Sequence, residues 1–202
     1  YIEILDEINE KEILQKLELI GRTCYKSENK IVKNSYYDFI EKIIKSEHLT
    51  ILEHRSISVR IVCDRGVSHE LVRHRIAAFS QESTRYCNYS ADKFNNEITV
   101  IEPCFWNIDD PIYKTWKYQM EKTEQGYFTL INMGASAQEA RNVLPNSLKT
   151  EVIATMNLRQ WRYVLTLRTS KKAHPQMQQI MNMILDKFIL LLPTIFIDIK
   201  KE

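Results

Sequence analysis

Two stretches of the sequence alternate between apolar and polar residues, and each leads into a segment with helical spacing. The first covers residues 56–63 and places Ile57, Val59 and Ile61 on one face. The second covers residues 150–156. Alternation with a period of two is typical of a half-buried strand. We therefore predict two strand-to-helix units, and basic residues lie at or near the end of both helices.

The remaining helices and strands follow from apolar spacing and from end signals. Ser35 can cap a helix, Pro111 and Pro175 stand at favourable first positions, and Gly134 can end a helix. The predicted helices cover residues 11–20, 35–46, 67–75, 111–133, 136–143, 157–168 and 175–192, and further strands are predicted over residues 1–5 and 98–101. We expect the last helix to be amphipathic, with its methionines in the core.

The composition is that of a globular protein with one core. The chain has 202 residues, of which 44% are hydrophobic and 27% charged, and its formal net charge is +2. A charge this small does not indicate a nucleic-acid coat or a membrane-surface protein. The length fits a single domain.

The cysteines and the apolar runs indicate the compartment. The four cysteines are widely spaced without a CxxC pair, so neither a zinc knuckle nor a disulfide framework is predicted. The first residues, YIEILDEIN, are acidic, and the apolar run 188–192 is too short to cross a bilayer. We expect a soluble cytoplasmic protein with reduced thiols.

The segment over residues 69–86 concentrates the polar chemistry of the chain. Its arginines and one of its histidines are Arg73, His74, Arg75 and Arg85. Arginine forks match phosphate or carboxylate, and Ser83 and Thr84 can add hydroxyl donors. The alternative is a solvated basic helix end followed by a polar loop. Because the apolar run 76–79 indicates partial burial, which would leave arginines in need of partners, we favour an anion site.

Two histidine patterns invite a metal interpretation. Residues 48–54 contain His48, Glu53 and His54, but no further ligand is suitably spaced nearby. Without one, histidines that form structural hydrogen bonds are commoner than metal ligands. In HELVRH, His69 and His74 are five residues apart, about 140° around a helix axis. They do not form the HExxH pair of a zinc protease, and no metal site is predicted.

Glycine-rich phosphate loops are missing from the sequence. Its four glycines form neither a GxGxxG nor a GxxxxGK[ST] motif. A Rossmann dinucleotide site and a P-loop are therefore excluded. Side chains and helix ends would have to hold any nucleotide.

Arg73-His74-Arg75, seven residues and then Ser83 resemble the RHRx7S signature of the flavin-dependent thymidylate synthases. Three further matches follow the order of that family: residues 48–54, residues 139–145, and residues 157–159 leading to 167–168. The matches together cover most of the chain. Four matches in register make chance an unconvincing explanation.

The resemblance implies a fold and a reaction. The fold would be α+β, a single domain over residues 1–202 with a mixed or antiparallel sheet flanked by helices. The reaction would methylate dUMP to dTMP, with 5,10-methylenetetrahydrofolate as carbon donor and NADPH reducing a bound FAD. No cysteine nucleophile would be needed. The resemblance also implies a homotetramer whose active sites are shared between subunits.

The resemblance assigns one group of residues to dUMP: Glu70, Arg73, Glu82, Ser83, Thr84, Arg85, Arg141 and Arg168. Arg141 would reach in from another subunit. Arg168 would be the catalytic residue, because a fixed positive charge at the pyrimidine favours ionisation of N3. The carboxylate of Glu70, if it lies near a phosphate, must be protonated, turned away or paired with an arginine.

A second group resembles the flavin-binding set: His48, Thr50, Glu53, Arg73, His74, Arg75, Gln81, Asn157, Arg159, Tyr163 and His174. Amides and cations in this set would hold the diphosphate and the isoalloxazine edge. A serine nucleophile at Ser83 with His74 as base is an alternative, but no orienting carboxylate is evident. We favour ligand binding for Ser83.

A different class of function remains open. A nucleotide-binding or RNA-binding protein could use the same basic loop without catalysis. The small net charge counts against RNA as a partner. The combination of flavin-type and nucleotide-type motifs counts against simple binding.

Overall fold

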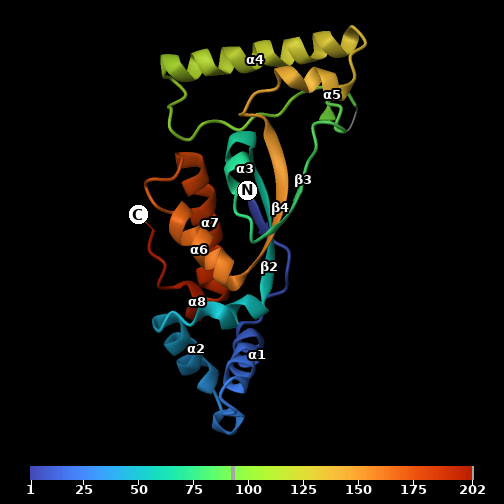
Figure 1. Cartoon of the computed structure of the whole chain (residues 1–202). Coiled ribbons are helices and arrows are strands. Elements are labelled where there is room, and N and C mark those ends of the chain that lie inside the picture. The colour runs from blue at the N-terminus through green and yellow to red at the C-terminus, as the bar shows by residue number, and fades with distance from the viewer. Residues whose placement is uncertain (92–93, 202) are drawn as a thin grey trace. The chain divides into compact units, whose positions relative to one another are not determined.

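The two alternating stretches form the central strands of a four-stranded antiparallel sheet in the computed structural model, which describes residues 1–91 and 94–201 (Figure 1). The strand order is β1-β2-β4-β3, with β1 at Ile2–Ile4, β2 at Ser56–Asp64, β3 at Ala78–Gln81 and β4 at Lys149–Asn157. Alternate residues of β2 and β4 are buried. The strands predicted over residues 1–5, 56–63 and 150–156 and the α+β fold class are confirmed.

The chain divides into two units made of interleaved segments. Unit 1 comprises Tyr1, Ile61–Arg73 and Phe79–Ile153. Unit 2 comprises Ile2–Arg60, His74–Ala78 and the chain from Ala154 onward. Both central strands continue from one unit into the other, so neither unit is a continuous piece of sequence.

Each central strand ends in a residue that caps the next helix. In unit 1, Asp64 Oδ1 accepts a hydrogen bond of 2.8 Å from Val67 N in α3 (Arg65–Leu71). In unit 2, Asn157 Oδ1 accepts one of 2.8 Å from Gln160 N in α6 (Leu158–Arg168). An Asp or Asn at the N-cap satisfies a backbone donor that the helix leaves unpaired. The same local device therefore starts both helices.

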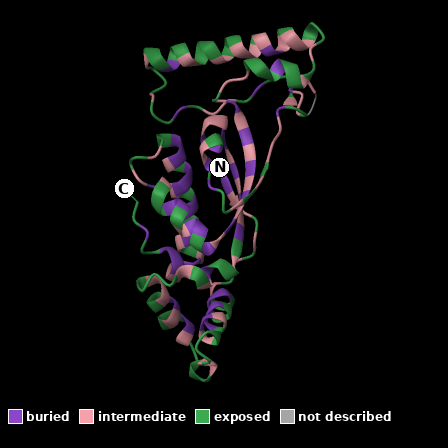
Figure 2. Cartoon of the chain, in the orientation of Figure 1, coloured by how far each residue is buried: buried purple, intermediate pink, exposed green. Residues whose placement is uncertain are grey.

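The helices of unit 2 enclose an aromatic core. They include α1 (Glu10–Thr23), α2 (Ser35–Lys45), α6, α7 (Pro175–Leu191) and α8 (Pro193–Phe196), with short 3₁₀ helices η1 (Glu28–Lys30) and η2 (Leu49–His54). The rings of Trp161 and Phe188 meet edge to face with centroids 5.4 Å apart. The Trp161 indole N–H donates to Ile57 O at 2.9 Å, which ties α6 to β2. Figure 2 shows the buried face of α7, as its amphipathic pattern predicted.

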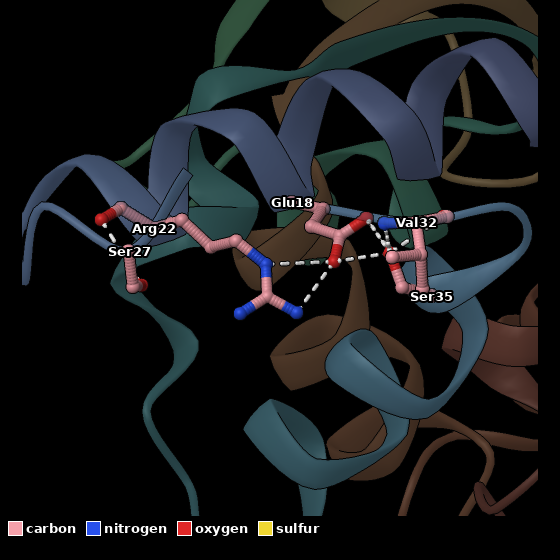
Figure 3. A network of polar contacts seen from close by, with 5 residues as sticks. All are labelled: Glu18, Arg22, Ser27, Val32 and Ser35. Carbon is pink, nitrogen blue, oxygen red and sulfur yellow. Dashed lines mark hydrogen bonds and ion pairs between the residues drawn. The ribbon is translucent and has the colours of Figure 1, made fainter. Parts of the chain in front are cut away.

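A buried carboxylate links α1 to the start of α2 (Figure 3). Glu18 is 1% exposed and lies 2.7 Å from Arg22 Nη2 in an ion pair. Ser35 Oγ lies 2.8 and 2.9 Å from the two carboxylate oxygens of Glu18. The prediction that Ser35 caps α2 is wrong, because Asn34, at φ 66°, occupies the cap position and the Ser35 hydroxyl contacts Glu18 instead.

Gly21 allows α1 to approach its neighbours in unit 2. A Cβ atom at this position would lie 2.6 Å from Phe39 Cζ and 2.7 Å from Ile51 Cδ1. Contacts this short require the neighbours to shift. The absence of a side chain at Gly21 therefore sets the spacing between α1, α2 and η2.

Unit 1 builds a smaller core beneath α4 (Pro111–Asn132). Tyr89, Ile98, Tyr127, Ala140 and Leu148 form its buried centre. Helix α4 buries only Tyr113 and Tyr127, and most of its surface is open in Figure 2. The helical spacing of Trp116, Met120, Leu130 and Ile131 predicts that they point inward together with Tyr127, yet these four are only half-buried. The predicted helix over residues 136–143 is present as α5 (Ala137–Ala140) followed by η4 (Arg141–Val143).

Three further local predictions need correction. Helix α3 ends at Leu71 and not at residue 75, so the Arg73-His74-Arg75 triplet lies in a loop. Ile76 is 69% exposed, which contradicts the expected burial of the apolar run. The predicted strand over residues 98–101 is reduced to a single bridge between Val100 and Leu148. Strand β3, which no pattern predicted, lies at the edge of the sheet, where a strand needs little apolar surface.

None of the helices within residues 1–91 and 94–201 combines the length and the apolar character that crossing a membrane requires.

Candidate functional site

The predicted site residues divide between the two units. Unit 1 holds most of those assigned to dUMP: Glu70, Arg73, Glu82, Ser83, Thr84, Arg85 and Arg141. Unit 2 holds Arg168 and most of those assigned to the flavin: His48, Thr50, Glu53, His74, Arg75, Asn157, Arg159, Tyr163 and His174. Gln81, assigned to the flavin, and Arg73, assigned to both ligands, lie in unit 1.

Ser83 opens a hydrogen-bonded turn shortly after β3. Its carbonyl oxygen accepts hydrogen bonds of 3.1 and 2.9 Å from the N–H groups of Tyr86 and Cys87. Its hydroxyl oxygen accepts one of 3.3 Å from Arg85 N. This contact uses a lone pair of the hydroxyl oxygen and does not use its hydrogen. The Ser83 hydroxyl can therefore donate that hydrogen to a ligand. The turn therefore suits the binding of an anion.

Arg85 lies on the exposed side of this turn. Its Nε donates to Gln138 Oε1 at 3.2 Å, and its guanidinium carbon lies 5.2 Å from the centre of the Tyr86 ring. Gln138 belongs to α5, and the exposed Arg141 begins η4 three residues later. The structure thus brings the α5 region to the turn. Gln138 was not predicted as a site residue, and its helical spacing from Arg141 was the only signal for it.

Glu82 is held at three points. Its N–H donates to Glu151 O at 2.8 Å, one carboxylate oxygen lies 2.9 Å from Lys149 Nζ, and the other accepts from Tyr89 OH at 3.3 Å. The Glu82 side chain is only 14% exposed. Neither Lys149 nor Tyr89 was predicted to take part in the site.

Gln81 connects α3 to β4 within unit 1. Its amide nitrogen donates to Ser68 Oγ at 2.9 Å and to Thr150 Oγ1 at 3.1 Å. Ser68 and Thr150 are buried. Since both amide hydrogens are committed to protein partners, only the Gln81 amide oxygen can serve a ligand in this arrangement.

The arginines of the RHR triplet are exposed. Neither Arg73 nor Arg75 forms an ion pair with any residue that the structure describes. Arg73 N donates to Glu70 O at 3.4 Å, which closes the turn after α3. The expectation that these arginines are buried is wrong, because both lie in the exposed part of the loop between α3 and β3. Their positive charge remains accessible to an anionic ligand.

His74, in contrast, is buried and paired. It is 7% exposed, and its Nε2 accepts a hydrogen bond of 3.1 Å from Arg168 Nε. Burial and then the charge of Arg168 lower the pKa of His74. A neutral imidazole that accepts through Nε2 carries its proton on Nδ1. Tyr163 lies edge to face with the His74 ring, with centroids 6.4 Å apart. His74 thus fixes the direction of Arg168.

The start of α6 lies against η2 within unit 2. Arg159 Nη1 and Glu53 Oε1 are 2.6 Å apart, and their side chains are 47% and 44% exposed. Asn157 Oδ1 caps α6, which leaves the donors of its amide nitrogen for other contacts. Thr50 belongs to η2, and His48 stands at its N-cap position. His174 stands at the N-cap position of α7.

The donor set of unit 2 fits a flavin dinucleotide. Arg159 supplies an accessible cation, and Thr50 and Asn157 supply hydroxyl and amide donors on neighbouring elements. Cations and amide donors are the groups that a diphosphate and the polar edge of an isoalloxazine require. The carboxylate of Glu53 holds Arg159 in the structure and would compete with an anion for it.

Two of the four cysteines, Cys63 and Cys104, have thiols with a raised pKa. Cys63 is buried, and burial together with the nearby Asp64 raises the pKa of its thiol to about 12. Burial also raises the pKa of the Cys104 thiol. A protonated thiol is a poor nucleophile. Among residues 1–91 and 94–201, no three His, Cys, Asp or Glu side chains are grouped to hold a metal ion.

Comparison with known proteins identifies the family. Residues 4–194 match the family described as thymidylate synthase complementing protein. The flavin-dependent thymidylate synthase of Pyrococcus furiosus is 34% identical over 161 residues, which are 79% of this chain and 65% of that protein. The Geobacter sulfurreducens enzyme of the same name is 32% identical over 187 residues, 89% of this chain and 79% of that protein. The chain therefore belongs to the flavin-dependent thymidylate synthase family.

Proposed function

We propose that this chain is a flavin-dependent thymidylate synthase that methylates dUMP to dTMP, with 5,10-methylenetetrahydrofolate as carbon donor and NADPH as reductant. Its family membership supports the reaction, although the chain spans only 65% of the length of the Pyrococcus furiosus relative. The observation that carries the proposal is the Arg168–His74 hydrogen bond, because it fixes a permanent cation beside a neutral imidazole.

The proposed role of Arg168 is to act on the uracil ring. A guanidinium stays charged at every physiological pH, and a fixed cation stabilises negative charge that develops on a nearby ring. Arg168 Nε is used by His74, so the direction of the terminal nitrogens is restricted. Arg168 would thereby favour the ionised form of N3 and a more electron-rich pyrimidine.

The proposed site for the dUMP phosphate and sugar is the Ser83 turn with its neighbouring cations. Ser83 can donate its hydroxyl hydrogen, and Arg73, Arg85 and Arg141 are exposed cations. Thr84 is buried within the turn and would stabilise its shape. In a homotetramer with shared sites, which we also propose, Arg141 would serve the dUMP of another subunit.

The proposed cofactor is FAD. NADPH would reduce the bound flavin, which would supply the hydride needed to turn the folate-derived carbon into a methyl group. Arg159, Asn157 and Thr50 would hold its diphosphate or ring edge, and His48, Arg75 and His174 would complete the site. Tyr163 is 60% exposed and offers an aromatic edge beside His74. These assignments rest on the chemistry of the donors within unit 2.

We further propose that residues 1–202 act as one domain in the cytoplasm. The interleaving of the two units supports a single domain, since cutting the chain at any one point would not release either unit intact. The four cysteines are free thiols, which fits a reducing compartment.

Flavin uptake and coupled turnover test the proposed function. The purified protein should bind FAD and show its absorbance, and it should oxidise NADPH and form dTMP when dUMP and methylenetetrahydrofolate are present. A colourless protein that takes up no added FAD and forms no dTMP would rule out the synthase. Binding of dUMP without any turnover would instead favour a nucleotide-binding protein.

A further inference from the structure

Glu82 immediately precedes the turn that we assign to the dUMP phosphate, although its own charge is unsuited to that ligand. A free carboxylate next to Ser83 would repel a phosphate. In the structure this carboxylate is directed to Lys149 Nζ at 2.9 Å and to Tyr89 OH at 3.3 Å. Its negative charge is therefore matched by a cation and a hydroxyl donor within unit 1.

Both partners are themselves firmly placed. Tyr89 is 4% exposed, and its ring packs against Tyr127 with centroids 5.7 Å apart. Tyr89 N also donates to Tyr127 OH at 3.3 Å. Burial and then the charge of Glu82 raise the pKa of Tyr89, so its hydroxyl stays protonated and remains a donor. Lys149 is the first residue of the central strand β4.

The backbone of Glu82 is tied to the same strand. Its N–H donates to Glu151 O at 2.8 Å, two residues beyond Lys149. Side chain and backbone together fix the position and the orientation of Glu82. Because Ser83 is the next residue, this attachment also determines where the turn begins.

We propose that Glu82 is a positioning residue, which holds the Ser83–Arg85 turn in its phosphate-binding shape through Lys149 and Tyr89 and does not contact the nucleotide itself. The inference rests on the proposed function, in which this turn binds dUMP. It replaces the direct dUMP contact that the family resemblance implied for Glu82. Lys149 and Tyr89 become part of the substrate site without touching the substrate.

The test uses the flavin-loaded protein and three single variants, Lys149→Met, Glu82→Gln and Tyr89→Phe. For Lys149→Met we expect the KM for dUMP to rise about tenfold, the factor that corresponds to one lost charge-assisted hydrogen bond. The kcat should stay within about twofold, because Arg168 is untouched. Glu82→Gln and Tyr89→Phe should raise KM by smaller factors, since each keeps part of the contact.

Two further measurements separate positioning from a general structural effect. The dissociation constant of deoxyuridine, which lacks the phosphate, should be unchanged in Lys149→Met, whereas that of dUMP should rise. The exchanged pair Glu82→Lys with Lys149→Glu restores opposite charges and should recover part of the lost dUMP affinity. Asp186→Asn removes a carboxylate from the Lys201 ion pair in unit 2 and serves as the matched control, with no expected change in KM.

The outcomes are distinguishable. If the wild-type protein forms dTMP but Lys149→Met and Tyr89→Phe leave its KM for dUMP unchanged, Glu82 is not a positioning residue. If the KM for dUMP rises only in Glu82→Gln, Glu82 contacts the nucleotide directly, and this result would also overturn the inference. Absence of flavin binding and turnover in the wild type would reject the proposed function itself.

Discussion

The two strand-to-helix junctions begin alike and deliver different cations. Asp64 and Asn157 each cap the following helix through a hydrogen bond of 2.8 Å. After Asp64, helix α3 stops at Leu71, and Arg73 follows in an exposed loop. After Asn157, helix α6 continues to Arg168, whose Nε is held by a buried His74.

This difference separates binding from chemistry. An exposed arginine in a loop can adapt to a phosphate, whereas an arginine fixed by a neutral imidazole is preorganised to act on a ring. Because the caps are alike, the contact with His74 is what distinguishes the cation of the second junction from Arg73.

Arg168→Ala should abolish most of the chemistry and spare the cofactor. We expect kcat for dTMP formation to fall by about 10²- to 10³-fold, as when a preorganised electrostatic group is removed. Flavin content, measured by absorbance, should be unchanged. Lys187→Ala, which removes an exposed cation from α7, is the control. Turnover close to wild type in Arg168→Ala would remove this residue from its proposed role.

Lowering the pH should reduce kcat, because protonation of His74 removes the acceptor that holds Arg168. Burial lowers its pKa, so the imidazole is neutral near neutral pH and accepts from Arg168. Below the lowered pKa it becomes a second cation and loses its acceptor, and kcat should fall about tenfold per pH unit. His74→Gln should lack this acidic limb in its pH profile. If kcat of His74→Gln falls at acidic pH as in the wild type, another group is responsible for that fall.

The same pKa shift predicts a change in stability with a definite sign. An unfolded chain protonates His74 near its ordinary pKa of about 6.5, whereas the folded chain does so only at lower pH. The contribution of His74 to the free energy of unfolding is therefore complete at a pH above its ordinary pKa. It is lost as the pH falls from there toward the lowered pKa of the folded chain. Denaturant titrations of wild type and His74→Gln over this range would measure the difference.

Arg73→Ala should give the opposite kinetic pattern from Arg168→Ala. Removal of an accessible phosphate ligand should raise the KM for dUMP about tenfold and leave kcat within about twofold. Arg73→Lys should recover part of the affinity, since it restores the charge without the fork. A large loss of kcat in Arg73→Ala with unchanged KM would show that the two junctions do not divide the work in this way.

Removing either helix cap should have the smallest effect, a modest loss of stability. Asp64→Ala and Asn157→Ala should each reduce the free energy of unfolding by about 1 kcal/mol. Asp64→Asn and Asn157→Asp keep a capping oxygen and should be milder. Thermal unfolding would compare the four variants, and a loss in Asn157→Asp as large as in Asn157→Ala would indicate that its amide has another essential partner.

The sequence could predict elements whose signal is local. The alternation in β2 and β4 was readable because one face of each strand is buried, and the apolar stripe of α7 was readable for the same reason. Strand β3 escaped prediction because its four residues lie at the sheet edge and show no fully buried position. The end of α3 differs by four residues from the prediction, because the helical spacing of Val67, Leu71 and Val72 does not show where a helix stops.

Contacts between residues that are far apart in the sequence could not be predicted from local patterns. His74 and Arg168 are 94 positions apart, and Glu82 and Lys149 are 67 positions apart. Periodicity gives the face of one element but not its partner in space. The family resemblance grouped most of the site residues by ligand, yet it did not indicate that His74 directs Arg168 or that Lys149 and Tyr89 hold Glu82.

The ionisation of bound dUMP tests the role of Arg168 most directly. Nitrogen-15 NMR of dUMP labelled at N3 and bound to the oxidised flavoprotein at neutral pH would report whether N3 carries its proton. We predict that N3 is deprotonated in the wild-type complex and protonated in the Arg168→Ala complex. A protonated N3 in the wild-type complex would contradict the proposal that a fixed Arg168 activates the pyrimidine.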